Sequence, residues 1–146
     1  MLNLALVSSD HDGDELELYS AGQMSVAVRP TKEIQFPQAH AEEGLRVQSR
    51  LTGSPLTVVK VPAVTLDEAL VRAKAPREID FFSLDVEGFE EEVLKGLNFE
   101  KWAFRWVLVE TRNLAELQVF MQDRGYSFHS QLGDLDALFV NQDLMR

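Results

Sequence analysis

The sequence predicts an α/β domain in which strands and helices alternate along a largely parallel sheet. Three observations support this expectation. From Val58 onward the segments follow the order strand, helix, strand, helix, strand, helix, strand, strand. Residues 79–86 (IDFFSLDV) show little alternation, which is typical of a strand covered by helices on both faces. A short turn at Gly133-Asp134 joins the last two strands, so we expect an antiparallel hairpin at one edge.

The first third of the chain has weaker patterns. Residues 2–7 (LNLALV) form a short apolar run that predicts a buried strand. Asp and Gly at residues 11–14 favour a turn, and the alternation in residues 15–20 (ELELYS) predicts a half-exposed strand. Residues 21–55 hold three prolines and three glycines, and we predict a long irregular insertion with a short strand at 24–28.

Clear start and stop signals mark the elements of the second half. Thr65 and Glu68 have the spacing of a capping box, and Pro76 stops the helix that they open. Asn113 can cap a helix that runs through Arg124, with Gly125 after its end. The remaining segments are predicted strands at 56–61 (ended by Pro62), 104–110, 126–130 and 137–140, and a helix at 89–97.

Length and composition fit one globular domain spanning 1–146. The chain has no cysteine, which excludes disulfides and thiolate metal sites. The formal net charge of −10 argues against nucleic acid and anionic membrane surfaces as partners. The sequence has no apolar run of about 20 residues, and its start lacks the basic leader of a signal peptide. We therefore expect a soluble protein, and a cytoplasmic location.

Acidic residues follow two of the predicted strands, at Asp85 and Glu110. Ligands of open α/β sheets bind beyond the carboxyl ends of the strands, so we expect both carboxylates at one functional edge. Asp85 follows an apolar run and either caps the next helix or has a functional role. Glu110 has a structural alternative, an ion pair with Arg105 or Arg112. Glu87 lies in the turn between strand and helix, and Gly88 would permit a tight turn there.

Neither the histidines nor the acids predict a metal site. His11, His40 and His129 lie far apart and have no ligand spacing, so each is expected at the surface or in a turn. Asp85, Glu87 and Glu110 would suit Mg²⁺ or Ca²⁺, but carboxylates alone are a weak signal. The acids at 90–92 fall in a first helical turn, where the helix dipole favours them.

Residues 79–97 (IDFFSLDVEGFEEEVLKGL) resemble the signature of FkbM-type S-adenosylmethionine-dependent methyltransferases. Further pieces follow in the order of that family. They are Thr65-Leu66-Asp67 before the signature, residues 107–110 (VLVE) after it, Gly125-Tyr126 before the closing hairpin, and Ser8-Ser9-Asp10 near the start. The resemblance covers most of the chain and is least clear in residues 21–55.

The resemblance implies a Rossmann-like class I methyltransferase fold that uses S-adenosylmethionine to methylate a hydroxyl of a sugar or natural product. The acceptor would be a small molecule or a glycan. Asp85 would lie beside the transferred methyl group and position the acceptor hydroxyl or take its proton, with Glu87 and Glu110 as further catalytic candidates. Ser9 and Asp10 would be the candidates for cofactor contact.

The sequence departs from the family in one respect. The family has a glycine-containing loop after its first strand, and this sequence has no Gly-x-Gly. Residues 2–7 correspond to the family's third strand, so the strand of Asp85 would lack one neighbour and have an unpaired edge. Three interpretations stay open: a methyltransferase that lacks its N-terminal segment, an interaction module completed by a partner chain or a second copy, and a degenerate relative that binds no cofactor.

Overall fold

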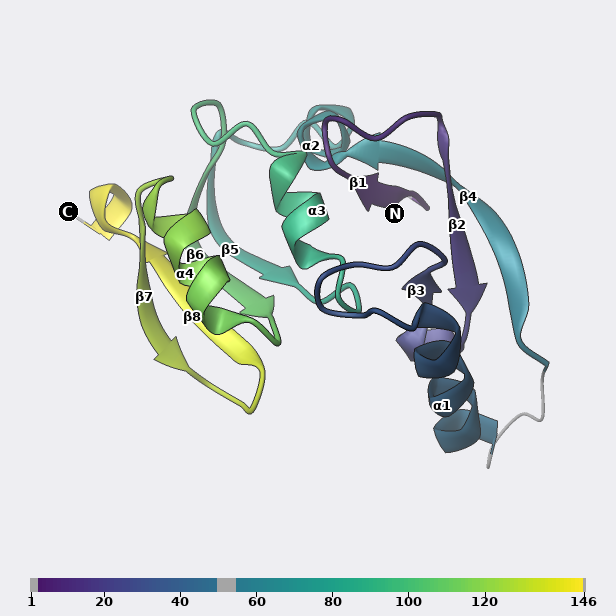
Figure 1. The fold of residues 1–146 in the computed structure, drawn as a ribbon. Coiled ribbons are helices and arrows are strands. Elements are labelled where there is room, and N and C mark those ends of the chain that lie inside the picture. The colour runs from purple at the N-terminus through teal and green to yellow at the C-terminus, as the bar shows by residue number, and fades with distance from the viewer. Residues whose placement is uncertain (1–2, 50–54, 146) are drawn as a thin grey trace.

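The computed structural model describes residues 3–49 and 55–145, which form two four-stranded sheets flanked by helices (Figure 1). The N-terminal sheet has the strand order β1-β4-β2-β3, and the C-terminal sheet has the order β5-β6-β8-β7. The strands are β1 (Ala5–Val7), β2 (Glu15–Ser20), β3 (Val26–Ala27), β4 (Thr57–Thr65), β5 (Glu78–Leu84), β6 (Ala103–Glu110), β7 (Tyr126–Gln131) and β8 (Asp136–Asn141). The α-helices are α1 (Pro37–Ser49), α2 (Leu66–Arg72), α3 (Glu90–Lys95) and α4 (Leu114–Gln122), and the 3-10 helices are η1 (Gly22–Met24) and η2 (Gln142–Met145).

The long strand β4 organises the N-terminal sheet. Its first part pairs antiparallel with β2, and its last three residues pair in parallel with β1. The predicted end of this strand at Pro62 is wrong, because β4 continues to Thr65. Pro62 lies where β4 changes partner from β2 to β1, a position at which a missing N–H donor is tolerated. The predicted strand from residue 2 begins in the described part at Ala5.

The C-terminal sheet combines one parallel pair with an antiparallel hairpin. β5 and β6 run parallel, β8 is antiparallel to β6, and β7 pairs with β8 at the sheet edge. The predicted closing hairpin is therefore confirmed. A largely parallel sheet is not found, because only two of the six pairings among the described strands are parallel. The reason is that α2 carries the chain from β4 to a different sheet and not to a neighbouring strand.

Local signals for helix boundaries were accurate. Thr65 and Glu68 form the predicted capping box at the start of α2. The Asn113 side chain accepts a hydrogen bond from the Glu116 N–H at the start of α4, and Gly125 has the positive φ of a residue after a helix end. These signals act within one turn of chain, so they need no tertiary information.

The segment 21–55 is not irregular throughout, because α1 occupies much of it. Its start has Pro37, whose fixed φ suits a first helical position. Gly44 lowers the helix propensity but lets the helix approach η1, since a Cβ on Gly44 would lie 2.6 Å from the Cβ of Met24. The short strand predicted at 24–28 is confirmed as β3. Residues 50–54 lie outside the described residues.

One hydrophobic core joins the two sheets through α3, which lies between them in Figure 1. Val93 and Leu94 of α3 pack among residues of β1, β5 and β6 in this core. β5 is not covered on both faces as predicted, because Phe81 is 53 % exposed. Within the described residues β5 pairs only with β6, and β1 pairs only with β4. No helix in the described part of the chain has the length and apolarity needed to cross a membrane.

Candidate functional site

The turn after β5 is held in an unusual backbone conformation. Glu87 and Gly88 both have positive φ values, 53° and 80°. A Cβ on Gly88 would also lie 2.6 Å from the side chain of Ile34, so this position needs glycine for two reasons. Non-glycine residues at positive φ are uncommon and cost conformational energy, and they gather at functional sites. Glu87 is therefore placed by the turn at a defined orientation.

Glu90, the first residue of α3, stabilises this turn through hydrogen bonds to its backbone. Its Oε1 atom accepts hydrogen bonds from the N–H groups of Val86 (2.9 Å) and Gly88 (3.2 Å). Glu90 is only 2 % exposed, and burial raises the pKa of its carboxyl above the usual range. The sequence pattern of Glu90 indicates only the helix dipole, because hydrogen bonds to its own turn leave no mark in the hydrophobic pattern.

Asp85 and Glu110 meet at one rim of the C-terminal sheet, as predicted from the parallel strands. Leu84 and Val109 are register partners in β5 and β6, so the two acids follow at adjacent strand ends. Partial burial, and then the hydrogen bond and negative charge of Asp85, raise the pKa of Glu110 to about 7. The pair can therefore hold or release a proton near neutral pH. Asp85 does not cap α3, whose N-cap residue is Phe89. The charge of Arg112 lowers the pKa of Glu110, which agrees in part with the arginine alternative, but no direct ion pair between them is found among the described residues.

Glu87 contacts His40 of α1, and its charge also acts on Glu110. The His40 Nε2 and Glu87 Oε2 atoms are 2.9 Å apart, and both side chains are mostly buried. Arg112 Nη2 lies 4.0 Å from the same Glu87 oxygen. From the sequence, His40 is predicted to lie at the surface or in a turn. Its position in the chain, 47 residues before Glu87, gave no signal for this contact.

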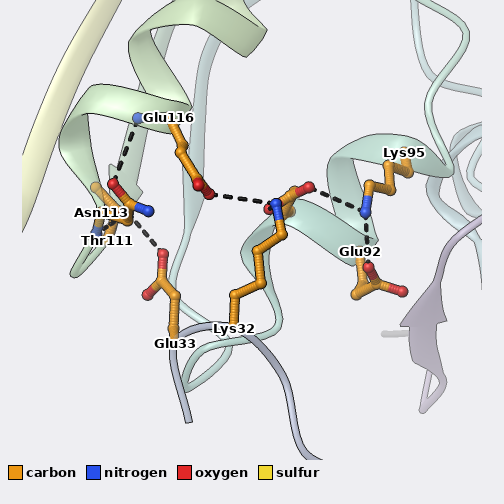
Figure 2. Close-up of polar contacts among 8 residues, drawn as sticks. Lys32, Glu33, Glu92, Lys95, Thr111, Asn113 and Glu116 are labelled. Carbon is orange, nitrogen blue, oxygen red and sulfur yellow. Dashed lines mark hydrogen bonds and ion pairs between the residues drawn. The ribbon is translucent and has the colours of Figure 1, made fainter. Parts of the chain in front are cut away.

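The segment before α1 crosses from the N-terminal sheet and is tied to the rim (Figure 2). Glu33 accepts hydrogen bonds from the Thr111 hydroxyl (2.7 Å) and from the Arg112 N–H (3.0 Å). Lys32 lies between Glu91 of α3 and Glu116 of α4, 3.6 Å and 3.3 Å from their carboxylates. This segment and the start of α1, residues 29–40, thus form a wall beside Asp85 and Glu110.

A cavity of about 610 Å³ lies between this wall, α3 and α4. Polar side chains such as Lys32, Glu33 and Glu90 line one part, and Leu117 and Phe120 line another. Asp85, Glu87 and Glu110 are not among its lining residues, so the cavity lies beside the acidic rim and Glu90 borders it. It can accommodate part of a small molecule whose reactive group reaches the rim.

Ser9 and Asp10 lie apart from the acidic rim. They follow β1, whose last residue Val7 contacts Gly96 at the carboxyl end of α3. The rim lies at the other end of α3, next to Glu90. The structure therefore brings together Asp85, Glu87 and Glu110 and leaves Ser9 and Asp10 outside that group. Their predicted contact with a cofactor stays a prediction, as do the catalytic roles of the acids.

Comparison with known proteins identifies the family. The family model described as Methyltransferase FkbM domain matches residues 3–128. The chain belongs to the FkbM methyltransferase family. The matched residues contain the whole rim, from Glu33 to Arg112, and the resemblance found in the sequence is confirmed. No curated protein and no solved structure matched the chain.

Proposed function

We propose that the protein serves S-adenosylmethionine-dependent O-methylation of a hydroxyl on a sugar or natural product. The family supports methyl transfer, and the observation that carries the proposal is the pair Asp85–Glu110 at the ends of two parallel strands. Methyl transfer to oxygen requires an acceptor hydroxyl that is held in line with the methyl donor and loses its proton. The exposed carboxylate of Asp85 is accessible to such a hydroxyl.

The chemistry of the pair suits a general base at neutral pH. A base works best when its pKa is near the operating pH, and the pKa of Glu110 is raised to about 7. In our proposal Asp85 contacts the acceptor hydroxyl, and Glu110 shares the released proton. His40 and Glu87 stand next to this pair, and the hydrogen bond between them orients the imidazole ring. They are secondary candidates for acceptor contact.

The wall formed by residues 29–40 supports a role of the 21–55 segment in acceptor choice. It contributes Lys32 and Glu33 to the cavity and His40 to the rim. A hydroxyl-rich acceptor needs several such polar partners to be oriented. Exchange of this segment between family members is expected to change the range of acceptors that are methylated, and an unchanged range would contradict this role.

We further propose that the described residues form only part of a site for S-adenosylmethionine. Ser9 and Asp10 do not converge with the rim, and the sequence has no glycine-rich loop to approach the cofactor. The free edge of β5 supports the proposal that a further strand pairs there and supplies the cofactor half.

An interaction module is the second candidate function. The unpaired edge of β5 and the exposed ring of Phe81 favour it, since an open strand edge can accept a strand from another polypeptide. Calorimetry of this chain with S-adenosylmethionine and light scattering separate the candidates. A stable monomer that binds the cofactor at micromolar affinity would contradict both the need for a partner and the missing cofactor half.

The catalytic role is tested in the complete protein, meaning this chain with any polypeptide encoded in frame upstream or any partner that co-purifies with it. Asp85→Asn is expected to lower turnover by about a hundredfold or more while the affinity for S-adenosylmethionine stays unchanged. Asp80→Asn is the matched control on the same strand, because its side chain is 93 % exposed and faces Arg105. Full turnover in Asp85→Asn would assign Asp85 to structure alone.

A further inference from the structure

Three carboxylates converge at the rim of the C-terminal sheet, and only two of them follow the strands. One oxygen each of Asp85, Glu90 and Glu110 lies within 4.8 Å of the other two. The sequence pattern pointed to Glu87 as the third acid, but Glu87 is turned toward His40. Glu90 takes its place because the tight turn at Gly88 folds the first residue of α3 back against the strand ends.

A second observation concerns the buried oxygen of Glu90. While Oε1 accepts two backbone hydrogen bonds, Oε2 is buried and has no hydrogen-bond partner in the described residues. A buried carboxylate oxygen without a partner is costly, and such groups in folded proteins are normally satisfied by a donor, a water or an ion. Glu90 is also one of the three residues whose carboxylate oxygens form the cluster.

The cluster has no direct ion pair with a basic side chain among the described residues, although the charge of Arg112 acts on Glu110. Within residues 3–49 and 55–145, Asp85, Glu90 and Glu110 form no ion pair with lysine, arginine or histidine. The guanidinium group of Arg112 is directed to Glu87. Other acids of the same helix are neutralised, since Lys95 contacts both Glu91 and Glu92.

The dimensions of the cluster fit a single hard cation. Two oxygens bound to one ion lie at most twice the ion–oxygen distance apart, which is roughly 4.2 Å for Mg²⁺ and roughly 4.8 Å for Ca²⁺. The three oxygens lie within 4.8 Å of one another, so small side-chain rotations bring all three to the ion–oxygen distance of one ion. Asp85 is exposed, so the ion would keep one side open to water or to a hydroxyl oxygen.

We propose that Asp85, Glu90 and Glu110 form a binding site for one divalent, oxygen-preferring cation. The site is distinct from the contacts of Glu87 with His40 and Arg112. It shares Asp85 and Glu110 with the proposed function but does not depend on it, because ion binding is measured without cofactor or acceptor.

Isothermal titration calorimetry of the full chain, stripped with a chelator, tests the site with MgCl₂, MnCl₂ and CaCl₂ separately. We expect saturable one-to-one binding of at least one of the three ions. Asp85→Asn and Glu110→Gln should each weaken that binding at least about tenfold. Glu91→Gln is the matched control, because its carboxylate lies on the same helix but contacts Lys32 and Lys95, and it should bind the ion as the wild type does.

Two outcomes would overturn the site. One is the absence of saturable binding of all three ions at millimolar concentration by a folded chain. The other is binding that Asp85→Asn and Glu110→Gln leave unchanged, since the ion would then lie elsewhere on this acidic surface. Glu90→Gln keeps the hydrogen-bond acceptor for the turn and removes the charge, and circular dichroism reports whether it folds. If Glu90→Gln fails to fold, the variants of exposed Asp85 and half-buried Glu110 decide the question. If the wild-type protein binds the ion but methylates no hydroxyl, the ion site is supported and only the proposed function is contradicted.

Discussion

The two sheets of this protein differ in how deeply their long strands are buried. In the C-terminal sheet, Val107 and Val109 of β6 and Phe139 of β8 are almost inaccessible to solvent. In the N-terminal sheet, Val58 and Val59 of β4 are 51 % and 40 % exposed. Asp85 and Glu110 of the candidate site stand at strand ends of the buried sheet, whereas the wall of residues 29–40 comes from the connection after β3 and the start of α1. The difference teaches that the buried sheet carries the acid pair and that a segment outside both sheets delivers further side chains to it.

The largest effect is expected from the core of the C-terminal sheet. Phe139→Ala leaves a large cavity and should lower the free energy of unfolding by about 3–5 kcal/mol. Val59→Ala on β4 removes a partly exposed side chain and should cost within about 0.5 kcal/mol. Urea denaturation followed by circular dichroism measures both. Equal costs would show that the deeper burial of the C-terminal sheet does not make it more important for stability, and would break the comparison.

A smaller effect is expected from the glycine of the turn. Gly88→Ala meets both a positive φ and the side chain of Ile34, and it should cost about 1–3 kcal/mol. Gly125→Ala is the matched control, because its φ of 83° is similar but its surroundings are open, and it should cost about 1 kcal/mol. The same denaturation experiment compares them. If the costs are equal, the contact between Ile34 and the turn does not hold the wall against the rim.

The smallest effect is the pH dependence of the acid pair. Because the folded pKa of Glu110 is raised from about 4.5 to about 7, the folded state binds its proton more tightly than the unfolded state. This contribution to stability is fully present below pH 4.5 and is lost as the pH rises through 7. Glu110→Gln mimics the protonated form, so it should match the wild type near pH 4 and be more stable at pH 8, by about 1 kcal/mol after allowance for solvent screening.

Thermal unfolding in metal-free buffer across this pH range measures the difference. Glu100→Gln, a change of an exposed acid in the connection after α3, is the control for the loss of one negative charge. A Glu110→Gln offset that does not grow between pH 4 and pH 8 would contradict the raised pKa and the placement of Glu110 against Asp85.

Local signals in the sequence predicted much of the C-terminal half. The capping box at Thr65, the cap at Asn113 and the turn at Gly88 each depend on a few neighbouring residues, and all were found. The parallel pair of strands placed Asp85 and Glu110 together for the same reason, since register along two adjacent strands follows from their lengths and ends. The helix α1 was missed because its glycine and its mixed polarity hide the helical period.

The sequence by itself determined the family, the two strand ends that carry Asp85 and Glu110, and the local geometry of the turn between them. The tertiary structure alone decided that β4 and β5 lie in different sheets, that Glu90 and not Glu87 joins the acid pair, and that His40 and Glu33 reach the rim. The physical reason is distance along the chain. Caps and turns are fixed by hydrogen bonds within one helical turn, whereas contacts across many residues are fixed only when the whole core packs.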